Sequence, residues 1–295
     1  MRVLAPAKIN WTLEVLGRRE DGYHELRSIL QTIGLCDTVT IKPAGEVKVA
    51  FSGRVEGLDG LGGNLVQAAY RVATGVFNRA DAVSIEVIKR IPAAGGLGGG
   101  SSDAAAVLRG LNALWGPVDR WRLREAAAEL GSDVPFFIEC GTVMVAGRGE
   151  ELTILPEAPR KHLVLALARD ETPAKTARMF AALQPQDFLD GAQSLALMLR
   201  FNHRLEYDDG HLCNSFERAG YTQLPHLAKT RDLLHGCGKE AHLAGAGPTL
   251  FAIFDEEGDA ETCASGLRVQ GVDAISVRTL ASIEALRVEA IQADG

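Results

Sequence analysis

The hydrophobic and polar positions in the first half of the chain follow two periods. Trp11, Leu13 and Val15 are separated by polar residues, and this period of two predicts a half-buried strand over residues 10–15. An Asp-Gly pair then predicts a turn within residues 17–22. The same reasoning predicts further strands over residues 38–42, 47–51, 83–88 and 142–146, and helices over residues 64–77, 101–115 and 119–130.

Strands and helices also intermix in the second half, without strict alternation of the two. We predict strands over residues 163–168, 250–254 and 274–278, and helices over residues 173–183, 187–200, 224–235 and 260–269. This order favours an α+β fold with antiparallel sheets over a doubly wound fold. The segment Pro156–Lys161 is a predicted domain boundary, so we expect one domain over residues 1–157 and a second over residues 158–295.

The composition is that of a globular protein, since 46% of the 295 residues are hydrophobic and 23% are charged. The formal net charge of −7 provides no basic field that would attract nucleic acid or an anionic membrane. Lys8 and Asn10 interrupt the first apolar stretch, which argues against a signal peptide, and no run reaches the ~20 apolar residues of a membrane span. We therefore expect a soluble, cytoplasmic protein with no nucleic-acid or membrane partner.

The five cysteines are dispersed along the chain and include no C-x-x-C pair. An odd, scattered set argues against a disulfide framework and against a structural metal site. We therefore expect free thiols at Cys36, Cys140, Cys213, Cys237 and Cys263.

A glycine cluster, Pro92-Ala-Ala-Gly-Gly-Leu-Gly-Gly-Gly-Ser-Ser-Asp103, lies between a predicted strand and a predicted helix. Glycine lets the backbone come close to an anion and adopt positive φ angles. The free N–H groups and the positive end of the helix dipole then favour phosphate. The pattern predicts a phosphate site, although a glycine-rich turn with a serine N-cap would produce the same pattern.

Two familiar nucleotide motifs do not fit this cluster. Gly95 and Gly100 have the spacing of a Walker A loop, but Ser101 stands where that loop requires lysine. Gly96 and Gly98 begin a Rossmann fingerprint, but its third glycine would also fall on Ser101. The predicted anion site therefore belongs to neither class.

Three motifs extend over nearly the whole chain: Ala5-Pro-Ala-Lys-Ile-Asn10, the glycine cluster continued to Ala106, and Leu243-Ala-Gly-Ala-Gly-Pro-Thr-Leu-Phe251. In this order they resemble the motifs of the GHMP kinases. The resemblance implies a two-domain α+β fold, with an N-terminal domain like domain 2 of ribosomal protein S5, a GHMP C-terminal domain and a cleft between them. It also implies a small-molecule kinase that uses ATP and Mg²⁺, with no side chain assigned as a metal ligand.

Three further segments are Arg19-Glu-Asp-Gly-Tyr-His-Glu-Leu26, the triple glycine Gly98–Gly100 and Gly131-Ser-Asp-Val-Pro-Phe136. Their combination resembles one branch of the family, whose phosphate acceptor is an alcohol that carries a cytidine diphosphate. Two alternatives remain: another GHMP kinase, of the homoserine or mevalonate type, or a catalytically silent protein that binds nucleotide. We expect a monomer or a weak homodimer.

The resemblance implies that the ATP phosphates bind the glycine cluster and that the adenine lies near Asn64. Asn64 is equally suited to be the N-cap of the predicted helix 64–77. The residues expected on the ATP side are Asn64, Pro92, Gly95, Gly96, Leu97, Gly98, Gly99, Gly100, Ser101 and Ser102.

Asp133 and Lys8 are the expected catalytic residues. From its sequence context, Asp133 could simply form an Asx turn or a helix cap. By resemblance, it is the carboxylate that accepts the proton of the acceptor hydroxyl, and it also contacts the substrate. A lone Lys8 would be a surface lysine with a buried stem, whereas the resemblance places its charge near Asp133. Asn10 lies two residues further on the same strand face and is expected to bind the substrate.

The remaining expected substrate contacts follow from the resemblance. Tyr23 is expected to stack on cytosine, His24 to read the polar edge of the base, and Phe180 to stack on the opposite side. Thr176 and Phe180 belong to the segment Lys175-Thr-Ala-Arg-Met-Phe180, which is similar to a Ser-Thr-x-x-x-aromatic pattern but has Lys175 in place of serine. Phe180 would otherwise be a core residue. The turn Gly245, Ala246 and Gly247 is expected beside the acceptor and the transferred phosphate.

Overall fold

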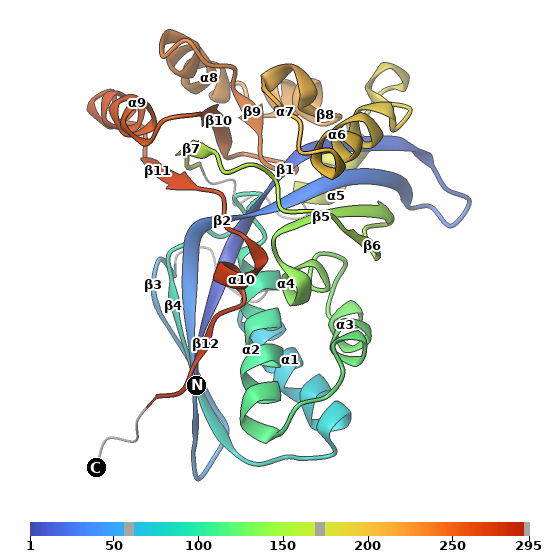
Figure 1. The fold of residues 1–295 in the computed structure, drawn as a ribbon, viewed down its shortest axis with the longest axis vertical. Coiled ribbons are helices and arrows are strands. Elements are labelled where there is room, and N and C mark those ends of the chain that lie inside the picture. Colours follow the sequence, from blue (N-terminus) through green and yellow to red (C-terminus); the bar gives the residue numbers. More distant parts are fainter. Residues whose placement is uncertain (56–61, 169–174, 292–295) are drawn as a thin grey trace.

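A computed structural model describes residues 1–55, 62–168 and 175–291 of the chain. Its first two strands, β1 (Arg2–Arg18) and β2 (His24–Pro43), pair as one long antiparallel hairpin. In Figure 1 this hairpin runs from the lower to the upper part of the molecule. The register between the two strands shifts between Asn10 and Thr12, and such a bulge changes which face of a strand the following side chains occupy. Lys8 and Asn10 precede this bulge.

The hairpin forms the middle of the larger sheet, whose strand order is β12-β1-β2-β4-β3. β5 also pairs with β2, β6 pairs with β5, and β8 pairs with β1. The pairings are antiparallel except for β3 with β4 and β8 with β1. The added strands are β3 (Lys48–Gly53), β4 (Val83–Lys89), β5 (Thr142–Gly147), β6 (Glu151–Ile154), β8 (Cys213–Asn214) and β12 (Val288–Glu289).

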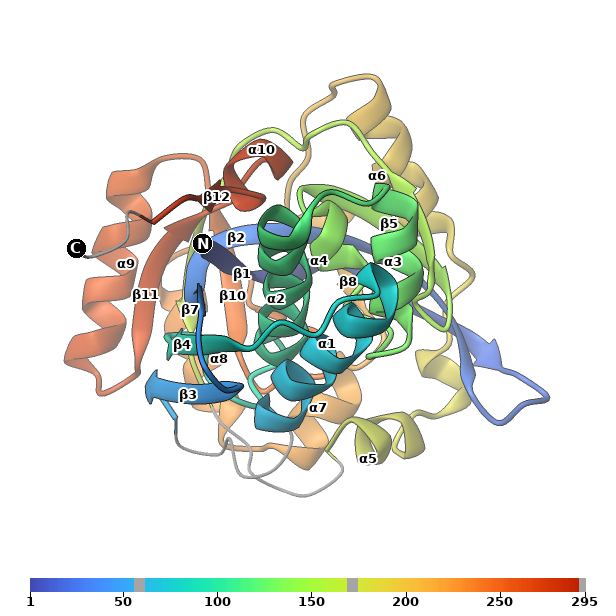
Figure 2. The ribbon, with the colours of Figure 1, turned by 90° about the horizontal axis from the view of Figure 1, so that it is seen from below.

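Helix α2 (Gly99–Trp115) lies against β1 and β2 and is surrounded by helices on its other sides (Figure 2). All residues from Ser102 to Leu111 are buried. Small side chains let this helix pack closely on the sheet: a Cβ atom at Gly110 would lie only 2.6 Å from Ile41 Cδ1. The surrounding helices are α1 (Gly62–Phe77), α3 (Arg120–Ala128) and α4 (Phe136–Glu139).

The smaller sheet is antiparallel and has the order β11-β7-β10-β9. Its strands are β7 (His162–Ala166), β9 (His242–Leu243), β10 (Leu250–Phe254) and β11 (Ala274–Arg278). Helices α8 (Leu227–Gly236) and α9 (Glu257–Val269) pack on it, and all five residues of β10 are buried. The other helices here are α5 (Lys175–Ala181), α6 (Ala192–Asn202), α7 (Glu217–Gln223) and α10 (Ser282–Ala285), with 3₁₀ turns at Pro185–Asp187 and Asp209–His211.

The α+β architecture with mainly antiparallel sheets is confirmed. After β11 the chain returns through α10 and β12 to the edge of the larger sheet (Figure 1). The proposed division at residue 157 stays a prediction. No helix in the described ranges is long and apolar enough to cross a membrane.

Several predicted elements have different boundaries in the structure. The helix predicted over residues 187–200 is wrong at its start, because Gly191 adopts a φ of 82° and α6 begins only after it. The helix predicted over residues 224–235 misses α7, and α8 begins at Leu227, after Pro225. The strand predicted over residues 38–42 is only the end of the 20-residue β2. Pro173, the predicted start of another helix, lies outside the described residues.

The expectation of five free thiols is wrong for one pair. Cys237 and Cys263 form a disulfide, with their Cα atoms 5.9 Å apart. Cys237 caps the end of α8 and Cys263 lies in α9, and these helices pack beside each other on the smaller sheet. The pairing has no sequence motif because it depends on this tertiary arrangement. Cys36, Cys140 and Cys213 are free, as expected.

Candidate active site

The glycine cluster forms the connection between β4 and α2, as its sequence context predicts. Gly96 and Gly98 have φ angles of 83° and 74°, in the region that favours glycine. A Cβ atom at Gly96 would lie 2.1 Å from the carbonyl oxygen of Ala244. Glycine is therefore required here both by the backbone conformation and by the close approach of a distant segment.

Helix α2 begins two residues earlier than predicted. Its N-cap is Gly98, so Ser101 and Ser102 lie in the first turn and neither is the N-cap. The Ser102 hydroxyl is buried and has no hydrogen-bond partner within the described residues. The glycine-rich turn and the N-terminus of this long helix together offer backbone N–H groups and a positive dipole end, which is the chemistry that binds phosphate.

The third motif forms a tight turn against the glycine cluster. The backbone N–H groups of Ala244 and Gly247 donate to Thr249 O and Ala244 O, at 2.9 and 2.8 Å. A Cβ atom at Gly245 would lie 2.9 Å from Gly96 O and 3.1 Å from Lys8 Nζ. The three motifs, far apart in sequence, therefore meet at one place.

Asn214, in β8, holds this turn in position and was missed by the sequence analysis. Its side-chain amide donates to Leu243 O and to Gly245 O, at 2.8 Å each. Because β8 pairs with β1 at Leu13, the turn is fixed relative to the strand that carries Lys8. The two-residue strand β8 has no periodicity from which this role could be predicted.

Lys8 is 5% exposed, so the alternative of a surface lysine is wrong. Its Nζ donates to Asn10 Oδ1 at 2.9 Å, and Asn10 Nδ2 donates to Ser28 Oγ at 2.8 Å. The backbone N–H of Lys8 donates to Leu97 O at 3.0 Å, which ties β1 to the glycine cluster. Burial lowers the pKa of the Lys8 ammonium, and the charge of Asp133 opposes this shift.

Asp133 lies in the turn between α3 and α4 and is half-buried. Its carboxylate makes no hydrogen bond within the described residues, yet it interacts electrostatically with the buried ammonium of Lys8. A carboxylate close to a buried cation, with its hydrogen-bonding capacity unused, is suited to accept a proton from a bound hydroxyl group.

A buried ionic cluster beneath the glycine cluster was also missed. Lys89, at the end of β4, donates to Asp37 and to Asp103 in α2, and all three residues are at most 3% exposed. Asp37 also accepts the N–H of Arg90 and, at 2.8 Å, the N–H of Ile91. Burial, together with the charge of Asp37, raises the pKa of Asp103 to about 8. The cluster joins the strand before the phosphate loop to the helix after it.

The residues expected around cytosine include a stacked pair. The rings of His24 and Phe180 lie 4.7 Å apart at 22°, and Phe188 and Phe216 flank this pair. Burial and the charge of Arg18 lower the pKa of His24, which favours a neutral ring. Tyr23 is 59% exposed, and the guanidinium of Arg148 lies 5.0 Å from its ring centre. The expected stacking of cytosine between Tyr23 and Phe180 stays a prediction.

Two other expected contacts remain untested. The N-cap prediction for Asn64 is wrong, because α1 already begins at Gly62. The side chain of Asn64 lies outside the part of the chain that the structure describes, so its expected place near the adenine is not tested. Thr176 is the second residue of α5 and is exposed. Both stay predictions.

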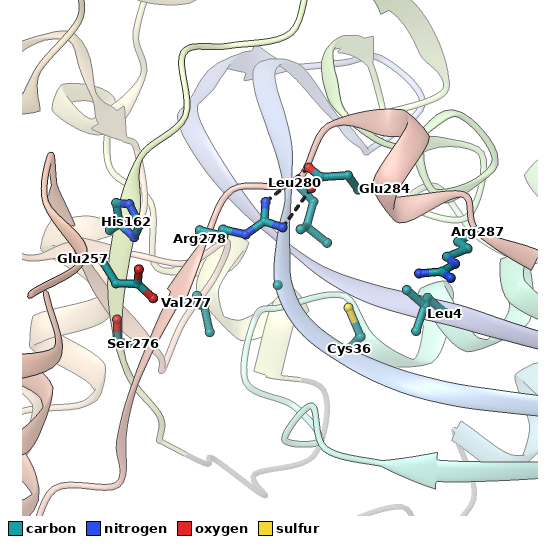
Figure 3. A pocket seen from close by; sticks show the side chains of 11 residues that line it. Leu4, Cys36, His162, Glu257, Ser276, Val277, Arg278, Leu280, Glu284 and Arg287 are labelled. Atoms are coloured by element: carbon teal, nitrogen blue, oxygen red, sulfur yellow. Dashed lines mark hydrogen bonds and ion pairs between the residues drawn. The ribbon is translucent and has the colours of Figure 1, made fainter.

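A cavity of about 580 Å³ lies away from these motifs. Figure 3 shows Arg278 and Glu284 paired on its wall, 2.8 Å apart, between His162 on one side and Cys36 and Arg287 on the other. None of its lining residues belongs to the three motifs. Within the described residues no group of three or more His, Cys, Asp or Glu side chains could hold a metal ion.

Comparison with known proteins identifies the family. Residues 64–141 match the family model "GHMP kinases N terminal domain", and residues 190–273 match "GHMP kinases C terminal". The chain belongs to the GHMP kinases. This kinase is 41% identical over 289 residues to a 4-diphosphocytidyl-2-C-methyl-D-erythritol kinase of Dehalococcoides mccartyi, with 96% of this chain and all of the relative covered. It is 37% identical to the enzyme of that description from Geobacter sulfurreducens, with 94% and 98% covered.

Solved structures agree with this placement of the kinase. A crystal structure of 4-(cytidine 5'-diphospho)-2C-methyl-D-erythritol kinase is 32% identical, has a TM-score of 0.79 and covers 95% of this chain and 99% of its own. A homoserine kinase from Cytophaga hutchinsonii has a TM-score of 0.69 at 17% identity, with 95% and 94% covered, and shows the shared fold alone. Within the GHMP kinases, the chain belongs to the 4-diphosphocytidyl-2-C-methyl-D-erythritol kinases.

Proposed function

We propose that this kinase transfers the γ-phosphoryl group of ATP to the 2-hydroxyl of 4-diphosphocytidyl-2-C-methyl-D-erythritol, giving the 2-phosphate and ADP. This reaction belongs to the non-mevalonate route to isoprenoids. The relatives that share nearly the whole chain support the substrate. The observation that carries the mechanism is the convergence of Lys8, Gly96 and Gly245, with Asp133 close to Lys8.

Asp133 accepts the proton of the 2-hydroxyl in this proposal. Phosphoryl transfer has a loose transition state in most analyses, so an oriented carboxylate is sufficient and a strong base is not needed. The ammonium of Lys8 stabilises negative charge on the acceptor oxygen and on the transferred group, and its burial strengthens this interaction. Asn10, bonded to both Lys8 and Ser28, fixes the ammonium, and in this proposal it also contacts the substrate.

The ATP phosphates bind the glycine cluster and the N-terminus of α2 in this proposal. Here the backbone N–H groups and the unpartnered Ser102 hydroxyl provide donors. The wider ATP side comprises Asn64, near the adenine, and Pro92, Gly95, Gly96, Leu97, Gly98, Gly99, Gly100 and Ser101. The glycine turn Gly245, Ala246 and Gly247 closes over the acceptor and the transferred phosphate.

Cytosine binds beside the aromatic pair in this proposal, with Phe180 as a stacking surface and the neutral His24 reading the polar edge of the base. The flat face of a ring accepts any base, so the polar contacts select cytosine. Tyr23 and Thr176 contribute from the exposed rim of the site.

The family's use of Mg²⁺ is compatible with the absence of an acidic cluster among the described residues, because Mg²⁺ is often bound mainly through substrate phosphates. A bound Mg²⁺ ion would supply positive charge to offset the charge of the ATP phosphates.

A coupled assay of ADP release with Mg·ATP tests the substrate assignment. The panel of acceptors is 4-diphosphocytidyl-2-C-methyl-D-erythritol, homoserine and mevalonate. We expect turnover of the cytidyl compound alone. Turnover of homoserine or mevalonate without the cytidyl compound would overturn the substrate assignment, and no turnover of any acceptor would overturn the kinase function.

A further inference from the structure

Lys175, the first residue of α5, links two of the motifs. Its Nζ donates to Ala94 O, in the glycine cluster, at 2.5 Å, and also to Gly247 O, in the C-terminal glycine turn. Hydrogen bonds from an ammonium are roughly twice as strong as neutral ones. The lysine therefore connects the loop expected to hold the ATP phosphates with the turn expected to cover the acceptor.

Both carbonyl groups lie at places where the backbone is constrained. Ala94 has a φ of 54°, a left-handed conformation that costs a residue with a Cβ on the order of 1 kcal/mol or more. Gly247 has a φ of 72°, and its carbonyl oxygen lies 2.9 Å from the Cβ position of Gly96. The direct backbone bond between the two segments, from Thr249 N to Gly95 O, is 3.3 Å long. A charged donor at this junction supports a conformation that the backbone alone does not favour.

The segment that contains Lys175 is also informative. In the family-like segment that begins here, this chain has lysine in place of serine. Five residues later the same helix carries Phe180, whose ring is stacked on His24.

We propose that Lys175 is a positioning residue for the ATP side of the reaction. Its ammonium holds the glycine cluster against the C-terminal glycine turn and adds positive charge beside the phosphate site. This inference rests on the proposed function for its kinetic readout. Lys175 thereby contributes to ATP binding, whereas Phe180, on the same helix, contributes to binding of the cytidyl substrate.

Steady-state kinetics with each substrate varied in turn separates these roles. Lys175→Met is expected to raise the KM for ATP on the order of tenfold, the loss expected for a charged hydrogen bond, with a smaller change in the KM for the cytidyl substrate. Lys175→Ser is expected to behave like Lys175→Met, and Lys175→Arg to restore most of the ATP affinity. Lys229→Met, which removes an exposed lysine of α8, controls for the change in net charge and is expected to match the unaltered protein.

Two results would overturn the inference. One is an unchanged KM for ATP in Lys175→Met. The other is an increase only in the KM for the cytidyl substrate, which would show that the lysine merely anchors α5 and Phe180. If Lys175→Met unfolds in a thermal melt, Lys175→Gln serves the same comparison.

Direct binding keeps this test separate from the proposed function. The Kd of a non-hydrolysable ATP analogue, measured by calorimetry without any acceptor, is expected to rise in Lys175→Met but not in Lys229→Met. That result would support the role of Lys175 even if the cytidyl compound were not turned over. An unchanged Kd would overturn it even if the substrate assignment holds.

Discussion

The imidazole ring of His24 stacks on the phenyl ring of Phe180, with 4.7 Å between their centres and 22° between their planes. His24 begins β2 and Phe180 lies in α5, so the contact joins the long N-terminal hairpin to a helix from the second half of the chain. Phe216 packs edge-on against Phe180 at 4.9 Å and supports it from another side. The stack is therefore an aromatic surface that is formed before any substrate binds.

Removal of the phenyl ring tests whether cytosine uses this surface. Phe180→Ala is expected to raise the KM for the cytidyl substrate. The rise should correspond to a loss of up to ~1–3 kcal/mol of binding free energy, the range found for base stacking on aromatic side chains with nucleic acids. The KM for ATP should stay as it is, because the phosphate loop is held by other residues. Initial rates at saturating ATP measure the effect. An unchanged KM for the cytidyl substrate would move the base site away from Phe180.

Tyr23 provides the matched comparison within the same segment. If Tyr23 stacks on cytosine as predicted, Tyr23→Ala raises the KM for the cytidyl substrate by a similar amount. Tyr23→Phe should preserve the KM, since it keeps the ring. The ring is 59% exposed and lies beside Arg148, so folding should tolerate either change. A normal KM in Tyr23→Ala together with a raised KM in Phe180→Ala would assign stacking to Phe180 alone.

Asp133→Asn tests the proposed base. The variant keeps the shape of the side chain but cannot accept the proton, so kcat should fall by roughly 10²–10⁴-fold. ATP affinity should change little, because the carboxylate makes no hydrogen bond to the phosphate loop in the described structure. Single-turnover rates and a separate ATP titration measure the two quantities. Turnover at the normal rate would exclude Asp133 as the base.

The buried ammonium of Lys8 predicts an alkaline limit to activity. Burial lowers its pKa below the ordinary 10.5, so the positive form is lost at a lower pH than in an exposed lysine. Since the charged form is the active one, kcat/KM should decline as the pH rises through this lowered pKa. Lys8→Arg should move the decline to higher pH, and Lys8→Met should have low activity throughout. A profile with the same alkaline limit in Lys8→Arg would assign that limit to another group.

The sequence predicts some parts of the site better than others, for physical reasons. The glycine cluster is predictable because a local strand–loop–helix pattern determines both its conformation and its anion chemistry. Lys8 is recognisable only by resemblance, since its burial depends on the distant Gly245 turn. The role of Asn214 in a two-residue strand and the Cys237–Cys263 disulfide arise from tertiary packing and have no local pattern.

The buried cluster of Asp37, Lys89 and Asp103 illustrates the same limit. Lys89 ends a strand that was predicted correctly, and Asp103 belongs to the recognised glycine motif. Nothing in either local pattern shows that Asp37, near the end of β2, meets them both. The helix start differs for a related reason: Gly98 takes the N-cap position because its left-handed backbone fits the turn against Phe137, which local propensity does not encode.

Ser101→Asp tests the phosphate site at the start of α2. Ser101 is the third residue of the helix, where an acidic side chain suits the helix dipole, so folding should be retained. The added carboxylate would repel the ATP phosphates, and we expect no measurable ATP binding by calorimetry. Ser101→Ala is the control and should lower the affinity only slightly. ATP binding of normal strength in Ser101→Asp would contradict the assignment of the phosphates to this loop.

We expect the stability of the protein to depend on pH through the titration of Asp103. The variant Asp103→Asn should lack this dependence. Burial raises the pKa of this carboxyl group from 3.8 to about 8. Between these values the folded protein keeps a proton that the unfolded chain has released, so the contribution of Asp103 is fully present below the lower pKa and is lost as the pH rises through the higher one. Asp103→Asn does not titrate and retains an oxygen acceptor for Lys89.

Urea unfolding of both proteins at several pH values measures the difference. The free energy of unfolding of Asp103→Asn should increase relative to that of the unaltered protein as the pH rises from about 5 to about 8, and the difference should then level off. Burial opposes the charge of Lys89, yet Asp103 and Asp37 together raise its pKa above the ordinary 10.5, so its titration lies above this range of pH. A difference that does not change with pH would show that Asp103 is ionised in the folded state at neutral pH. The cluster would then carry a net negative charge beside the phosphate site, where it would oppose ATP binding.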